Sequence, residues 1–146
     1  MIRNIKQPEK IDLVIPEIVV DINDDIMRIV RDTRDTMKAN SLKSLSAPHI
    51  GFQKRISLVD VDLFQDNAGL SGVLVMINPN ITDGIGDVYV EESFLSEPDR
   101  LVPKMRAYIS VVEYTDINGK RNEISAVSDL SAAIQHEIEC LEGKVF

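Results

Sequence analysis

Three features that would each define a class of protein are missing from this sequence. It has one cysteine, so no disulfide can form within the chain, and a reducing cytoplasmic compartment is the default expectation. It has no apolar run of about 18 residues and no apolar core of a signal peptide near its start, so no association with a membrane is expected. Basic residues are scarce, 16 against 24 acidic ones, and the net charge of -8 argues against binding to nucleic acid.

The rest of the composition is ordinary for a globular chain. The 146 residues are 44% hydrophobic and 27% charged, and a chain of this length can bury roughly two-thirds of its unfolded surface. We therefore expect a single domain over residues 1–146.

The first third of the chain predicts one helix between two irregular segments. Residues 24–39 carry apolar side chains at helical spacing, and Asn23 is a suitable N-cap. Before the helix we expect an extended segment with one short strand around residues 18–20. After it, residues 41–51 contain small residues, a proline and a glycine, which predict a loop or an edge.

The remaining residues predict strands followed by a second helix. Its apolar stripe runs over residues 130–141, with Ser128 or Asp129 as the cap and Gly143 as the end. The expected fold class is α+β, with mainly antiparallel strands packed around this terminal helix. The expected strands are residues 56–61, 73–77, 88–90, 107–114 and 123–127, the last two joined by a tight turn at Asn118-Gly119.

The terminal helix carries the one motif with recognisable chemistry, His136-Glu137-x-x-Cys140. Positions i and i+4 share a helix face, so His136 and Cys140 could both reach one metal ion, and Glu137 could act on water beside it. Taken alone, the motif favours ordinary helix residues over a metal site.

Three blocks in order resemble the signatures of the peptide deformylase family. The family pattern G-x-G-[LI]-[AS]-A-P-Q-x-G is similar to residues 42–51, E-G-C-L-S to Glu92-Ser93-Phe94-Leu95-Ser96, and Q-H-E-x-D-H-L-x-G to residues 135–143. The segment Ile77-Asn78-Pro79 also looks like the family's I-N-P, and the resemblance extends from about residue 14 to 146. It implies the deformylase fold and a metal-dependent hydrolase that removes the formyl group from N-formylmethionine of new chains.

The resemblance also implies a metal site, but this sequence departs from it. In the family the ion is held by the cysteine of the second block and both histidines of the third. These positions are Phe94, His136 and Cys140 here. Phe94 cannot coordinate a metal, so one ligand is lost, one is kept and one has changed its chemical type.

The resemblance implies further site residues. Glu137 would move the proton, while His49, in place of the family's glutamine, and the backbone amide of Leu95 would bind the developing oxyanion. The substrate-facing positions are Lys43, Ser44, Glu92, Ser93 and Arg100.

Because these departures gather in the pocket, our main expectation is a pseudoenzyme without deformylase activity, which would bind peptide N-termini or a protein partner. We accordingly expect no cofactor. The alternative is a metal-dependent amide hydrolase with one iron, zinc or nickel ion in a rebuilt site, where His49 could join His136 and Cys140. A third hypothesis is metal or redox sensing through Cys140, although Glu137 and Glu139 should disfavour its thiolate.

Two further expectations concern other activities. Ser44, Ser46 and Ser93 show no spacing that would form a serine-hydrolase triad with a histidine. The sequence stops soon after the third block, and many family members continue into a helix that contacts the ribosome. We therefore expect no ribosome docking by that route.

Overall fold

Two α-helices and seven strands make up the part of the chain that the structure describes. It is a computed structural model that describes residues 1–6, 15–95 and 97–143, so Ser96 and the last residues of the family resemblance, 144–146, lie outside the described ranges. The elements are α1 (Asp24–Ala39), β1 (Ser44–Ser46), the 3-10 helix η2 (Ala47–Ile50), β2 (Ile56–Asp60), the 3-10 helix η3 (Val61–Leu63), β3 (Val73–Ile85), β4 (Val88–Phe94), β5 (Glu97–Arg106), β6 (Ile109–Thr115), β7 (Arg121–Val127) and α2 (Ser128–Leu141).

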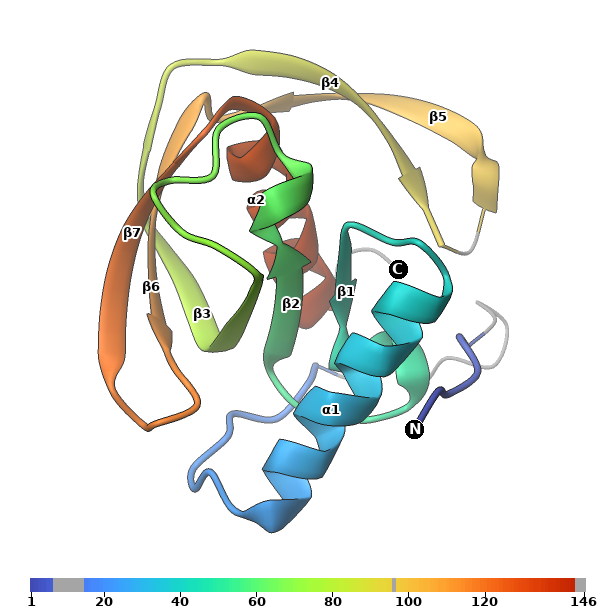
Figure 1. Ribbon diagram of the computed structural model, residues 1–146. Helices are drawn as coiled ribbons and strands as arrows, with labels where there is room; N and C mark the ends of the chain where they lie inside the picture. The colour runs from blue at the N-terminus through green and yellow to red at the C-terminus, as the bar shows by residue number, and fades with distance from the viewer. Residues whose placement is uncertain (7–14, 96, 144–146) are drawn as a thin grey trace.

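The strands form two antiparallel sheets around helix α2. Five strands pair in the order β1-β2-β3-β6-β7, and β4 pairs with β5 in a separate two-stranded sheet. Figure 1 shows α2 at the centre of the molecule, with the larger sheet around it and the β4–β5 pair crossing above. This arrangement confirms the expected α+β class and places α2 where side chains from both sheets can reach it.

Helix α1 begins and ends as its sequence predicts. The side chain of Asn23 accepts a hydrogen bond from the backbone N–H of Ile26 at 3.0 Å, which satisfies one of the free donors of the first turn. The apolar face of α1, including Ile29, Val30 and Met37, is buried in a core that also contains residues of β1 and β2.

Helix α2 is held by a second core. Its side chains Leu130, Ile134 and Ile138 pack among buried residues of the larger sheet, which include Met76 and Val112. This packing fixes the rotation of α2 about its axis, and so fixes which face it turns toward β4 and β5.

The expected cap of α2 is wrong. The N-cap is Val127, and no side chain accepts a hydrogen bond there. The backbone N–H of Ser128 instead donates to the carbonyl of Tyr108 at 2.7 Å, so strand pairing continues to the first helical residue. Asp129, the other expected cap, lies in the first turn of the helix.

The irregular segments near the start are more ordered than we expected. Around residues 18–20 there is no strand in the described chain, only a parallel bridge between Glu17 and Lys54. Asn78 holds this segment instead, because its side chain bonds both the N–H and the carbonyl of Val19, at 2.9 and 2.8 Å. Residues 44–50 form the edge strand β1 and then η2, so the edge alternative of the prediction is confirmed.

Proline misled the strand prediction in two places. Strand β3 continues past Asn78 and Pro79 to Ile85, with register shifts near these residues. Strand β5 contains Pro98 and Pro103 and was missed. A two-stranded sheet leaves one edge of each strand unpaired, and proline is tolerated there because it needs no donor.

Neither described helix reaches the 18 apolar residues that crossing a bilayer requires.

Candidate metal centre

Three donor side chains converge on one face of α2. The ligand atoms of His136, Glu137 and Cys140 all lie within 4.8 Å of one another, and Glu137 and Cys140 are buried. Residues i and i+4 of a helix are neighbours, which explains His136 and Cys140, but adjacent residues normally diverge. Helical spacing therefore does not explain why Glu137 belongs to the cluster.

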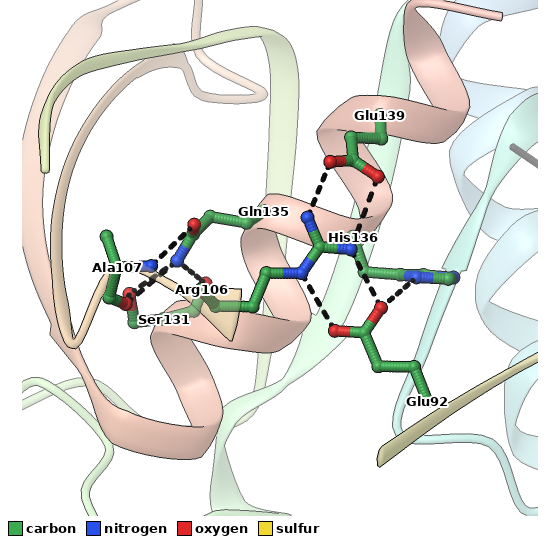
Figure 2. Close-up of polar contacts among 7 residues, drawn as sticks. All are labelled: Glu92, Arg106, Ala107, Ser131, Gln135, His136 and Glu139. Carbon is green, nitrogen blue, oxygen red and sulfur yellow. Dashed lines mark hydrogen bonds and ion pairs between the residues drawn. The ribbon is translucent and has the colours of Figure 1, made fainter. Parts of the chain in front are cut away.

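A buried guanidinium holds the surroundings of His136. Figure 2 shows Arg106, the last residue of β5, between Glu92 of β4 and Glu139 of α2. Arg106 donates to both oxygens of Glu92 at 2.9 and 2.7 Å and to both oxygens of Glu139 at 2.5 and 3.2 Å. These paired bonds fix the β4–β5 sheet against α2.

Glu92 connects this network to the histidine. Its Oε1 lies 2.9 Å from Nδ1 of His136. Burial alone would raise the pKa of Glu92, but its hydrogen bonds to Arg106 and His136 outweigh burial and hold the pKa at about 2. The permanent carboxylate orients the imidazole ring and leaves Nε2 as the nitrogen that can bind a metal. Carboxylates behind metal-binding histidines commonly have this role.

A second set of hydrogen bonds holds Gln135, the residue before His136 on α2. The side chain of Gln135 accepts from the N–H of Ala107 and donates to its carbonyl, both at 3.0 Å, as Figure 2 shows. Ser131 donates to the same carbonyl at 2.8 Å. These bonds tie the start of the β5–β6 connection to α2 on the side away from the ligand cluster.

Glu137 is the most unusual of the three donors. It is 2% exposed, and its Oε2 has no hydrogen-bond partner within the described residues. Burial raises the pKa of Glu137 to about 7, although the charge of His136 and hydrogen bonding from Ser46 and Ser44 oppose the shift. A buried oxygen without a partner costs about 1–3 kcal/mol, so this atom would gain from an added cation.

Cys140 is a buried thiol rather than a reactive one. Burial and the nearby carboxylates of Glu137 and Glu139 raise its pKa well above the ordinary value. Redox sensing needs an exposed thiolate, so this setting gives the sensing hypothesis no support. A metal ion would favour the thiolate directly, as it does in zinc sites.

Phe94 lies beside the histidine. Its ring stacks on the His136 ring, with centroids 5.6 Å apart and the planes 21° from parallel. The side chain therefore covers one side of the imidazole and adds no ligand.

His49 is fully buried in η2, and its Nδ1 accepts a hydrogen bond from the N–H of Ser46 at 3.2 Å. A neutral imidazole that accepts at Nδ1 carries its proton on Nε2, so His49 presents a donor as the family's glutamine would. Among the described residues it does not join the ligand cluster. The structure thus brings His136, Glu137 and Cys140 together but not His49 with them.

The candidate substrate residues are spread more widely. Ser44 adjoins Glu137, and Ser93 lines a cavity with Glu92 and His136. Lys43 is exposed, with its Nζ 5.4 Å from the ring of Phe64, and Arg100 is exposed in an ion pair with Glu97. Leu95 follows β4 and packs against the core that contains α1. No contact within the described chain tests the substrate-binding or oxyanion-binding roles expected of these residues.

Sequence reasoning missed Arg106, Glu139 and Gln135. Arg106 is the only strongly buried arginine in the described chain, at 6% exposure, but its two carboxylate partners lie 14 and 33 residues away. The β4–β5 register pairs Arg106 with Val88 and Glu92 with Val102, so the strand pairing alone would not have placed Arg106 beside Glu92.

The cluster fits a divalent metal. Imidazole, thiolate and carboxylate are all ligands of zinc and of other first-row ions. The unpartnered Oε2 of Glu137 is a buried oxygen that a bound ion or a water would satisfy. Our expectation that the site has no metal is therefore not supported, although no ion is established.

Comparison with known proteins identifies the family. The family described as Polypeptide deformylase matches residues 5–146. A peptide deformylase of Thermodesulfovibrio yellowstonii is 36% identical over 94% of this chain and 82% of its own length, and peptide deformylase 1 of Clostridium perfringens is 40% identical over 88% and 84%. The crystal structure of a peptide deformylase from Ehrlichia chaffeensis in complex with actinonin is 32% identical, with a TM-score of 0.89 over 99% of this chain and 86% of that one.

These relatives correct our main functional expectation. A pseudoenzyme was expected because Phe94 and Cys140 replace family ligands, but proteins 36–40% identical over most of the chain are named as deformylases. A fold neighbour is also solved with actinonin bound. These findings favour the alternative, a hydrolase with a rebuilt site. The chain belongs to the polypeptide deformylase family.

Proposed function

We propose that this protein is a metal-dependent amide hydrolase that removes the formyl group from N-formylmethionyl peptides. The observation that carries the proposal is the cluster of imidazole, carboxylate and thiol donors on α2, with ligand atoms within 4.8 Å of one another. Family membership supports the reaction class, and the donor set supports the need for a metal.

His136 and Cys140 would hold the ion. Glu92 fixes the His136 ring through Nδ1, and Arg106 fixes Glu92, so the metal-binding nitrogen is oriented before any ion arrives. The chemistry supplied by a bound divalent ion is Lewis-acid polarisation of a carbonyl and activation of water near neutral pH.

Two hydrogen-bond donors of the chain would stabilise the oxygen that gains negative charge during hydrolysis. The Nε2–H of His49 would donate to the oxygen that gains negative charge, in the position where the family has a glutamine. The backbone N–H of Leu95 would be a second such donor. His49 is buried, and the side chain of Leu95 packs against the core.

A cavity beside the histidine supplies room for the substrate. It measures about 230 Å³ and is lined by Val90, Ala132 and Ala133 together with Glu92, Ser93 and His136. Its apolar wall would contact the methionine side chain of the substrate.

The test is release of formate from an N-formyl-methionyl tripeptide by protein loaded separately with iron under anaerobic conditions and with zinc. The acetylated peptide and metal-free protein are the controls for specificity and for background. We expect formate release by loaded protein, its loss in His136→Ala, and unchanged rates in Glu123→Gln, an exposed site on β7. Loaded wild-type protein that releases no formate above the metal-free control would refute the proposal.

A further inference from the structure

We propose that Asp129 extends the specificity of the cavity beside His136 to a long side chain that ends in a cation, in addition to methionine. The inference rests on the proposed function, because the same cavity receives the first side chain of the substrate. It makes Asp129 a specificity-determining residue and names formylated peptides that begin with arginine or lysine as further substrates. The reaction is unchanged: water is added across the formyl C–N bond, which gives formate and the free amine.

The first argument is the spacing of the cavity wall along α2. Part of this wall is a stripe with positions i, i+3, i+4 and i+7, which share one helix face: Asp129, Ala132, Ala133 and His136. Seven residues of helix span about 10 Å. A side chain that enters beside His136 therefore runs along the two alanines toward Asp129, and a longer side chain approaches Asp129 more closely than methionine does.

The second argument is the room in the cavity. The two residues in the middle of the stripe, Ala132 and Ala133, are among the smallest, so no large side chain of α2 fills this space. The cavity of about 230 Å³ has the volume of roughly seven waters at about 30 Å³ each. An arginine side chain has about that number of non-hydrogen atoms, and methionine has about half as many. A methionine side chain therefore leaves part of the cavity for a longer one.

The third argument is the charge at the far end of the stripe. Asp129 is exposed, and its carboxylate has no hydrogen bond or ion pair within the described chain. The buried guanidinium of Arg106 is bonded to Glu92 and Glu139, as Figure 2 shows, so it is not available to Asp129. Glu91 also lines the cavity, but side chains of adjacent strand residues point to opposite faces, so the inference depends on Asp129 alone.

Arginine and lysine suit a cavity with an apolar wall and an acidic end. Their methylene stems pack on apolar surface, here Val90 and the alanines, while the charged end stays in water. Lys104 lies opposite Val90 in the β4–β5 register, but it does not line the cavity and forms no ion pair with Asp129 among the described residues. The carboxylate of Asp129 is thus left for a cation of the substrate.

The test compares substrates that differ only in the charge at the end of the first side chain. The peptides are formyl-X-Ala-Ser with X methionine, arginine or citrulline, because citrulline has the shape of arginine without its charge. Formate release by metal-loaded wild type, Asp129→Asn and the exposed control Glu123→Gln gives kcat/KM for each peptide. A second readout needs no metal: calorimetric titration of metal-free protein with the products Arg-Ala-Ser and citrulline-Ala-Ser. Circular dichroism establishes that each variant is folded.

We expect wild-type protein to favour arginine over citrulline by about fivefold in both readouts, which is the size of an exposed ion pair. Asp129→Asn should bring this ratio below about twofold, and Glu123→Gln should leave it unchanged. Added salt should also lower the ratio, because it screens exposed charges.

A wild-type ratio below about twofold, or a ratio that Asp129→Asn leaves unchanged, would overturn the inference. Hydrolysis of the methionine peptide alone would overturn it too, while the proposed function would survive. If loaded protein releases no formate from any of the peptides, the proposed function fails, and the titration of metal-free protein still decides whether Asp129 selects the cation.

Discussion

Replacing Arg106 tests the network that positions His136. Its guanidinium side chain is 5% exposed and lies between Glu92, 12% exposed, and Glu139, 27% exposed. Arg106→Leu would leave both carboxylates without their cation. Breaking a buried pair in this way costs about 3–5 kcal/mol. Because Glu92 keeps His136 as a partner and Glu139 can turn toward water, we expect a loss of about 3 kcal/mol.

The assay is urea denaturation of metal-free protein at neutral pH, so that metal binding does not contribute to stability. The matched control is Arg100→Leu, on the same strand, whose pair with Glu97 is exposed at 70% and 53% and should contribute at most about 1 kcal/mol. The double variant Arg106→Leu with Glu92→Gln should recover at least about 1 kcal/mol, because it removes the stranded charge. A loss below about 1 kcal/mol for Arg106→Leu would show that the network is no stronger than a surface ion pair and would refute the reasoning.

Three further predictions concern the scaffold, each measured by denaturation. Asn23→Ala should cost about 1 kcal/mol, because it removes the acceptor for the N–H of Ile26, and an unchanged midpoint would count against the cap. Ile134→Ala, at a side chain with 0% exposure under α2, should cost about 2–5 kcal/mol, and a loss under about 1 would mean that the core is less tightly packed than described. A hydrogen bond from the backbone N–H of Lys120 lowers the pKa of Asp116 in the folded protein. The charge of Asp116 therefore stabilises the hairpin fully above its unfolded pKa of about 4. This stabilisation is lost progressively as the pH falls through the lower folded pKa. The stability difference between wild type and Asp116→Asn should therefore shrink below about pH 4, and a constant difference would contradict this.

The sequence predicted the elements whose signals are local. Helix α1 followed from its apolar period and from Asn23, and the β6–β7 hairpin followed from Asn118-Gly119. The start of α2 did not, because a backbone bond from Ser128 to Tyr108, 20 positions earlier, replaces a side-chain cap. Such long-range bonds leave no local mark.

The residues of the candidate site also divide into those predicted from local sequence signals and those that depend on long-range contacts. His136 and Cys140 could be paired from their spacing alone, because four residues make one helical turn. The position of Phe94 beside His136 was expected only through the family resemblance, and its stacking was not. Arg106 escaped because its partners become neighbours only when β4, β5 and α2 assemble.

The most direct test of the account is formate release by one preparation measured before and after its metal is removed with a chelator and restored. The account predicts about one metal per chain, loss of activity on removal and recovery on addition of iron or zinc. Stoichiometrically loaded protein that leaves N-formyl-methionyl peptide intact would contradict it.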